Sequence, residues 1–403
     1  MSGTRDTGGA PQPERATLWN FVAYFLRLGA LGFGGPVALA NYMRRDLVEA
    51  RGWITAEEYE NGLALAAACP GPLAYQLGVY CGYIRFGVAG GLAVAVAFAL
   101  APFLIVSVAA YLYVRFASNW QLRALFYGIA PVVVALIVKA CWNLGKRTLR
   151  RDRLAWLFAV IACAVTVIVE KELAIMFIAS GVIGAFLFAR SFPVKPPVAS
   201  APPKPGSNAM VLVPAAAGAF SGTTAKLFLF FFKTGLLVFG SGLVIVPFLK
   251  TQVVDQYHWL NNRQFLDSVA IGMISPGPVV ITATFVGYLL NGLAGALAAT
   301  VGIFLPPVLF TVLATPILLR YHKHPRVAGF IRGVGVTVVG VLVGTTYLVG
   351  KEAIGDWLTI VTAIASLLVI MFWTKLPEPV VILAGGVIGL LSYQALQPQW
   401  LMH

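Results

Sequence analysis

The stretch AAACPGPLAYQ, from Ala66 to Gln76, places a Pro-Gly-Pro in the middle of an apolar segment. Proline removes a backbone donor and collides with the preceding helical turn, and glycine adopts dihedral angles that other residues avoid. The stretch MISPGPVVIT, from Met273 to Thr282, repeats this arrangement in the second half of the chain. In a bilayer such a break is tolerated only where the freed backbone groups meet protein, water or a ligand. Two broken helices at corresponding places indicate a transport site.

The composition indicates the broad class of protein. The 403 residues are 59% hydrophobic and 11% charged, whereas soluble domains carry about 25% charged residues. Several apolar runs approach the roughly 20 residues needed to cross a bilayer, among them 87–114, 154–169, 173–188 and 293–319. The first apolar run leads directly into further spans, so we expect no cleaved signal peptide. We predict an all-α polytopic membrane protein.

The charges and cysteines exclude several classes of function. The net charge of +14 lies in clusters between apolar runs, as in cytoplasmic loops of membrane proteins, and not on one soluble face as in a nucleic-acid-binding protein. The four cysteines lie in apolar runs without the spacing of metal ligands. No nucleophile with a base, metal triad or nucleotide-binding motif is present. We therefore expect neither an enzyme nor a cofactor, metal or nucleic-acid partner.

The two halves of the chain are similar position by position. With an offset of 206 residues the Pro-Gly-Pro at 70–72 meets that at 276–278, and Trp53 meets Trp259. After one residue is lost, an offset of 205 brings Pro102 onto Pro307. Such a match indicates an internal duplication. We divide the chain into a disordered tail (1–16), a first transporter repeat (17–190), a Pro/Ala-rich linker (191–225) and a second transporter repeat (226–403).

Equivalent loops of the two repeats differ in charge. The loop after the apolar run 122–144 begins with Lys146 and Arg147 and is strongly basic, whereas its counterpart holds Lys351, Glu352 and Asp356. In the second half the loop one segment earlier is the basic one. If basic loops are cytoplasmic, equivalent loops lie on opposite sides of the membrane. This predicts inverted-topology repeats with broken helices at the Gly-rich and Pro-Gly-Pro motifs.

Two stretches carry a family resemblance. They are LGFGGPVALANYMRRDLVEARGWITAEEYENGLALAAACPGP (31–72) and, in the second half, VFGSG (238–242) with WLNNRQFLDSVAIGMISPGP (259–278). They resemble the chromate ion transporter family, in its long two-domain form. The resemblance implies a secondary active transporter that exports chromate across the inner membrane with proton coupling. Leu39, Ala67 and Met273 stand where family members often carry polar residues, so an importer of sulfate or another tetrahedral oxyanion on the same scaffold stays open.

Independently of the resemblance, the helix breaks form a candidate anion site. A dianion near the bilayer centre needs compensation of its charge, and helix N-termini offer unpaired amides and a positive dipole end. Packing kinks between close helices are the alternative explanation. The candidate residues of the first half are Gly34, Gly35, Pro70, Gly71, Pro72, Tyr75 and Gln76. Those of the second half are Gly240, Ser241, Gly242, Ser275, Pro276, Gly277, Pro278, Thr282 and Thr284.

Charged residues within or beside apolar runs are further candidates. Arg27 and Lys233 occupy equivalent positions, which favours a pair of countercharges for the anion, with snorkelling to the interface as the alternative. Lys139 is a third candidate countercharge. For proton coupling we select Asp267 and Glu60, which precede the two breaks. The expected partners are chromate or sulfate, protons, the lipid bilayer and a second copy of the chain.

Overall fold

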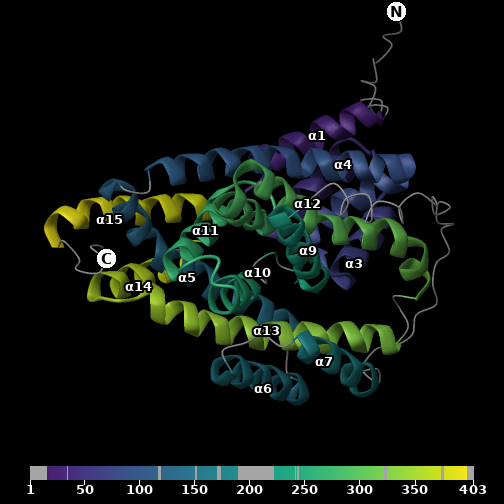
Figure 1. The fold of residues 1–403 in the computed structure, drawn as a ribbon. Coiled ribbons are helices and arrows are strands. Elements are labelled where there is room, and N and C mark those ends of the chain that lie inside the picture. The colour runs from purple at the N-terminus through teal and green to yellow at the C-terminus, as the bar shows by residue number, and fades with distance from the viewer. Residues whose placement is uncertain are drawn as a thin grey trace, which may run out of the picture.

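The computed structural model describes residues 16–33, 35–116, 119–149, 152–169, 174–188, 222–240, 242, 245–321, 325–373 and 376–396. The described chain is helical apart from two strands of two residues each (Figure 1), which confirms the all-α class. The predicted tail up to residue 15 and residues 191–221 of the predicted linker lie outside the described residues.

The first half starts with capped helices and continues with longer ones. Thr17 caps α1 by accepting from the amide of Asn20, and Thr55 with Glu58 forms a capping box at the start of α3. The elements are α1 (Leu18–Leu31), α2 (Gly35–Met43), the π-helix η1 (Arg44–Ala50), α3 (Ala56–Ala68), β1 (Gly71–Pro72), α4 (Leu73–Phe116), α5 (Trp120–Thr148), α6 (Arg153–Val169) and α7 (Ala174–Leu187).

The second half repeats this order. Its elements are α9 (Gly222–Leu237), β2 (Phe239–Gly240), α10 (Ile245–Phe248), the π-helix η5 (Leu249–Gln256), α11 (Asn262–Ile274), the 3-10 helix η6 (Val279–Ile281), α12 (Thr282–Tyr321), α13 (Pro325–Ala353), α14 (Trp357–Phe372) and α15 (Glu378–Leu396). The bounds of α3 and α11 correspond at an offset of 206, and those of α5 and α13 at 205. Helix α9 begins at Gly222, so regular structure starts inside the range predicted for the linker and before residue 226.

Helices α4 and α12 each contain a sharp reversal. At Gly87 φ is 66° and at Gly292 it is 57°, a conformation that glycine adopts without a steric penalty. Across the first reversal, Gly82 and Gly90 pack backbone against backbone. Each element is therefore a helical hairpin with a short limb, which follows the Pro-Gly-Pro, and a long limb.

The equivalent helices α5 and α13 run antiparallel. Four contacts follow one another along the pair. At one end Asp152 accepts from Arg332 at 2.8 Å, and Thr148 lies beside Gly335. Further along, Cys141 Sγ is 3.3 Å from Thr346 Oγ1, and at the other end Tyr127 donates to Asp356 at 2.6 Å. Residue numbers fall along one helix as they rise along the other. The two repeats are therefore inverted, as the loop charges predict.

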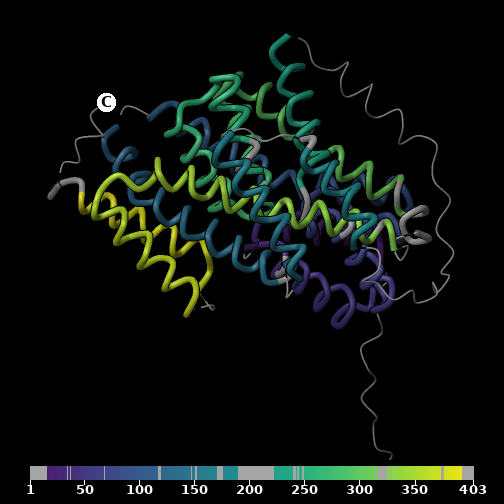
Figure 2. Tube along the Cα trace, turned by 90° about the horizontal axis from the view of Figure 1, so that it is seen from below, coloured from purple at the N-terminus to yellow at the C-terminus, as the bar shows by residue number. Residues whose placement is uncertain are grey.

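The last helices of each half pack on the other half. Helices α6 and α7 lie against α13, and α14 and α15 lie against α5 (Figure 2). Small residues allow the close approach: Gly184 packs on Gly333, and the equivalent pair Gly389 and Gly128 packs on the opposite side. Because the last helices of each half pack on the other half, two matching interfaces link the repeats, as a two-fold relation requires.

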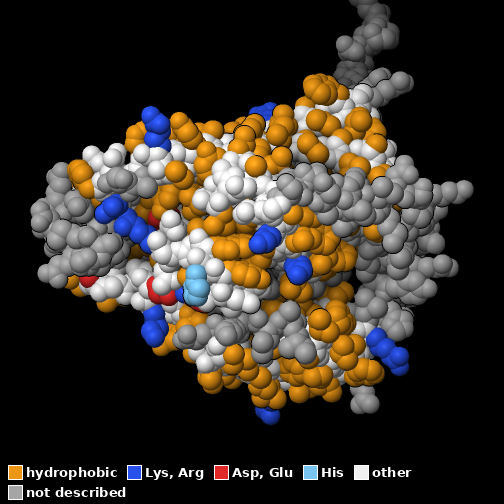
Figure 3. Space-filling model, viewed as in Figure 1, with side chains coloured by type: hydrophobic (Ala, Val, Ile, Leu, Met, Phe, Trp, Pro, Cys, Tyr) orange, Lys and Arg blue, Asp and Glu red, His pale blue; other side chains and the backbone are white. Residues whose placement is uncertain are grey.

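The apolar surface and the lengths of the helices are those expected of a protein that spans a membrane. Four helical stretches of the described chain are long and apolar enough to cross a bilayer, namely Leu73–Phe116, Trp120–Lys146, Val279–Leu313 and Ala328–Ala353. Hydrophobic side chains cover much of the face in Figure 3, with Lys and Arg at scattered points. Helices α6 and α14 also expose large apolar side chains, which matches the predicted contact with lipid.

Candidate functional site

The helix breaks of one half lie against the breaks of the other. The amide of Gly71 donates to the carbonyl of Val238 at 2.5 Å, and the amide of Gly277 donates to the carbonyl of Gly32 at 3.0 Å. These two bonds are equivalent under the repeat, at the offset of 206 residues. Strands β1 and β2 pair in parallel, with Gly71 opposite Phe239. Each Pro-Gly-Pro is thus held by the Gly-rich break of the other half, and we call this region the crossing.

The backbone at the crossing requires glycine. The φ angle is 138° at Gly71 and 88° at Gly277, values that residues with a Cβ rarely adopt. A Cβ on Gly71 would lie 2.8 Å from Pro307 Cβ, and one on Gly277 would lie 3.0 Å from Pro102 Cγ. Because Pro102 and Pro307 belong to the long limbs of α4 and α12, each break also packs against the long limb of the other half.

Two helices begin at the crossing and present their amino ends there. Helix α4 begins at Leu73 and η6 begins at Val279, so their first amides lack intrahelical partners and carry the positive end of the dipole. An ideal Cβ on Gly242 would lie 3.3 Å from the nitrogen of Val280 and 3.4 Å from that of Val279. The backbone of Gly242 therefore packs closely on these two amides, and a side chain at position 242 would crowd them.

The amides of the motif glycines are not free donors. Those of Gly71 and Gly277 are used in the bonds between the halves. An anion at the crossing would therefore meet the amides that follow each Pro-Gly-Pro, not those within it.

The first-half side chains hold the shape of the break. Gln76 Nε2 donates to the carbonyl of Pro70 at 2.7 Å, and the hydroxyl of Tyr75 donates to the carbonyl of Ala95 at 3.3 Å. The ring of Tyr75 also packs on Phe304, with centroids 4.6 Å apart. Gln76 Oε1 is buried and has no hydrogen-bond partner within the described residues. The hydroxyl of Tyr75 is thus used within the protein, whereas the amide nitrogen of Gln76 carries a second N–H besides the one given to Pro70.

The second-half hydroxyls are also engaged within the protein. Thr282 donates to the carbonyl of Val279 at 2.8 Å, and Ser275 donates to that of Gly272 at 3.0 Å. The hydroxyl of Thr284 lies 2.7 Å from that of Thr300. The sequence suggested Thr282 and Thr284 as free donors, but here they stabilise η6 and α12, because a buried hydroxyl without a partner is costly.

The remaining motif residues lie as follows. Gly35 begins α2 with φ of 77°, and Gly240 lies in β2 opposite Pro72. Pro276 and Pro278 are buried on either side of Gly277. Gly34 and Ser241, both predicted site residues, lie outside the described residues.

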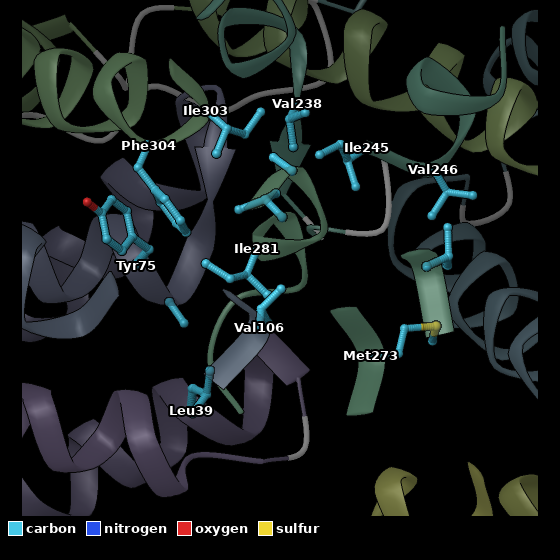
Figure 4. Close-up of a cluster of buried hydrophobic side chains, with 14 of the residues drawn as sticks. Leu39, Tyr75, Val106, Val238, Ile245, Val246, Met273, Ile281, Ile303 and Phe304 are labelled. Carbon is cyan, nitrogen blue, oxygen red and sulfur yellow. The ribbon is translucent and has the colours of Figure 1, made fainter. Parts of the chain in front are cut away.

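Apolar side chains surround the crossing. Figure 4 shows Leu39, Val238, Met273 and Ile281 among the buried cluster there. Leu39 covers Gly32, since a Cβ on that glycine would lie 2.5 Å from Leu39 Cδ2. Because these apolar side chains surround the helix ends, solvent screens the electric field of those ends only a little.

Asp267 is buried on α11, the helix that leads into the second Pro-Gly-Pro. It is 3% exposed, and Tyr113 of α4 donates to its Oδ2 at 2.7 Å. The ring of Tyr113 packs edge-on against Phe285 and Phe126. A carboxylate in such a site is costly unless compensated, which suits a group that gains and loses a proton. The sequence reasoning missed Tyr113, because nothing along the chain links it to a residue more than 150 positions away.

The other proton candidate lies on the surface. Glu60 is exposed and pairs with Arg44 at 2.8 Å. An exposed ion pair of this kind exchanges readily with water and is a poor carrier of a gated proton. Of the two predicted proton carriers, only Asp267 is buried.

The three predicted countercharges are not buried together at the crossing. Arg27 and Lys233 are exposed on the outer faces of α1 and α9, so they do not form a buried pair beside the motifs. Lys139 is partly buried and lies 3.6 Å from Glu378 of α15. Its charge is thus compensated by an acid within the protein, and its role as a countercharge for the anion stays a prediction.

Comparison with known proteins finds similarity over almost the whole chain. The sequence model of a family described as "Chromate transporter" matches residues 19–185 and 225–390. The chromate transport protein of Cupriavidus metallidurans is 44% identical over 397 residues, 98% of this chain and 98% of its own length. The probable chromate transport protein of Synechococcus elongatus is 38% identical over 94% of this chain and 96% of its own. The chromate transport protein of Pseudomonas aeruginosa is 33% identical over 92% and 91%. No solved structure matches.

Proposed function

Because the chain belongs to the chromate transporter family, we propose that it is a secondary active transporter that exports chromate across the inner membrane in exchange for protons. The chain is a multi-pass membrane protein and not an enzyme. The observation that carries the proposal is the crossing, where the breaks of two inverted repeats hold each other by equivalent hydrogen bonds. Broken helices at the interface of inverted repeats are typical of substrate sites in secondary transporters.

The helix ends at the crossing supply the chemistry for an oxyanion. Chromate is a tetrahedral dianion that accepts hydrogen bonds, and amides at a helix start bind such groups. The amides of Val279 and Val280 lie beside Gly242, which has no side chain to cover them. The apolar residues around them limit screening by water, so the dipoles act at nearly full strength.

The inverted repeats supply a route to alternating access. Two equivalent halves can exchange conformations, so that a shape open to one side has a counterpart open to the other. The bonds of Gly71 to Val238 and of Gly277 to Gly32 lie on the pseudo-symmetric interface. Rocking of one half against the other would strain one bond while the other persists.

The buried pair of Asp267 and Tyr113 supports proton coupling. The pair links α11, which leads into the second Pro-Gly-Pro, to the long limb of α4. Loss or gain of a proton on Asp267 changes the strength of this link. Protonation would thereby be coupled to the relative position of the two halves.

The distribution of charge supports an orientation of the molecule in the membrane. Lys146, Arg153, Arg326 and Arg332 lie at one end of the molecule, where the carboxyl end of α5 meets the amino end of α13. We call this the basic end. At the opposite end Glu352 and Asp356 balance the cations. By the positive-inside rule the basic end faces the cytoplasm.

The test is transport by the purified full chain in vesicles with an imposed pH gradient. We expect chromate to accumulate in vesicles with an acidic interior and the basic end facing outward, and accumulation to stop when the gradient is collapsed. Absence of both chromate and sulfate transport would overturn the proposal. Sulfate transport alone, in the opposite direction, would favour the importer.

A further inference from the structure

A pocket of about 650 Å³ opens beside the crossing, between α1, α2 and η1. Arg27, Arg45 and Arg51 line it together with one acid, Asp46. Its wall includes Gly32, whose carbonyl accepts the bond from the second Pro-Gly-Pro. The pocket therefore reaches from the surface to a residue that takes part in the contact between the two halves.

The pocket carries a net positive charge with a fixed arrangement. Asp46 is held by Arg45 Nε at 2.9 Å and by the hydroxyl of Tyr24 at 3.3 Å. Arg51 stacks on the ring of Trp53 at 4.5 Å from its centroid, which orients its guanidinium. Arg27 is exposed and has no ion pair within the described residues. Three guanidinium groups against one carboxylate favour a ligand with two negative charges.

The second half lacks this set of charges. At the offset of 206 residues, Arg45 corresponds to Thr251, Asp46 to Gln252 and Arg51 to Tyr257. Only Arg27 keeps a cationic counterpart, Lys233. The backbone scaffold is repeated but the arginines are not, so the pocket is a feature of one side of the transporter and not a by-product of the duplication.

The pocket lies at the basic end. Arg85 donates to the carbonyl of Trp53, which places the reversal at Gly87 beside η1. From Gly87 the long limb of α4 leads away to the amino end of α5 (Figure 1). The pocket is therefore at the end where α5 finishes, with Lys146. It faces the same side of the membrane as the basic loops.

We propose that this arginine pocket is the entrance site at which a tetrahedral oxyanion first docks before it reaches the crossing. The inference rests on the proposed function and adds a side-specific binding step to it. An entrance of this kind raises the local concentration of anions on one face only. It makes the two faces of the transporter differ in their affinity for the anion although the two halves share one scaffold.

The test measures chromate uptake by the full chain in vesicles of neutral phosphatidylcholine, with chromate offered to each side in turn. The variant is Arg27→Gln with Arg45→Gln, which leaves the stacked Arg51 in place. Two exposed charge contacts correspond to roughly tenfold in affinity. We expect KM for chromate offered at the basic end to rise by about that factor, with the maximal rate from that end and the KM from the other side unchanged.

Controls separate the pocket from general surface charge. The matched control is Lys146→Gln with Arg153→Gln, which removes two charges at the same end outside the pocket, and we expect it to keep the KM of the parent chain. The double variant Arg27→Lys with Arg45→Lys should recover most of the affinity. An unchanged KM in the glutamine variant, or an equal rise in the control, would overturn the entrance site.

Two further experimental results would distinguish the entrance site from a lipid-binding site and from a binding site in a protein that does not transport. A defect that appears only in vesicles containing phosphatidylglycerol would mean that the pocket holds a lipid phosphate, and would overturn the proposal. Binding of radiolabelled chromate to the detergent-purified chain, measured with the same variants, is independent of transport. Binding lost with the arginines in a chain that moves no anion would support the entrance site and reject the transport function.

Discussion

The amide of Gly277 donates a hydrogen bond of 3.0 Å to the carbonyl of Gly32, two residues that belong to different halves of the chain. The bond from Gly71 to Val238 is its counterpart under the repeat. Each half therefore completes the helix break of the other. Neither half can form the crossing alone.

Replacing Gly277 by alanine should abolish most transport. The new Cβ would lie 3.0 Å from Pro102, and the backbone at φ of 88° would be strained, by about 1–3 kcal/mol. Uptake in vesicles measures the effect. Gly87→Ala is the matched control, since φ there is 66° but no atom lies within 4 Å of the added Cβ. Equal loss in both variants would mean that strain alone matters, not the crossing.

Asp267→Asn should uncouple transport from the pH gradient. The amide still accepts from Tyr113 but cannot exchange a proton, so chromate exchange without a gradient should persist while gradient-driven accumulation is lost. Tyr113→Phe should keep coupling and shift its pH dependence, because the bond of 2.7 Å to the carboxyl is removed. Glu60→Gln, at an exposed carboxylate paired with Arg44, is the control. Normal coupling in Asp267→Asn would reject the proton role.

Lys139→Met should lower stability without altering affinity for chromate. Lys139 is 24% exposed and Glu378 is 32% exposed, so loss of the pair should cost about 1 kcal/mol. The double variant with Glu378→Met should recover part of the loss, as thermal unfolding in a double-mutant cycle would record. A large rise in KM in the single variant would return Lys139 to the substrate path.

Thr346→Cys should form a disulfide with the native Cys141. The two side chains approach to 3.3 Å on the antiparallel helices α5 and α13, and mild oxidation should link them. Mass spectrometry of the joined peptides detects the product. Cys81, which is buried in α4, serves as an internal control that should stay reduced. Failure of the link under conditions that oxidise exposed thiols would contradict the inverted packing.

The sequence alone determined the class of protein, the duplication and the positions of the breaks. These features are local or repetitive: a Pro-Gly-Pro interrupts a helix wherever it stands, and apolar runs predict spans. The loop charges also predicted the inversion, because topology depends on the membrane and not on packing. Capped helix starts such as Thr55 with Glu58 follow the same local rules.

Only the tertiary structure decided which groups meet. The repeat aligns Gly71 with Gly277 but does not say that each bonds to the opposite half, since backbone hydrogen bonds between distant breaks leave no pattern in side chains. Lys139 and Arg27 look alike in sequence, yet one meets Glu378 and the other lines a pocket. Tyr113 and Asp267 meet only because α4 and α11 pack together. The breaks are thus a property of local chain chemistry, and the site they form is a property of how two inverted halves pack.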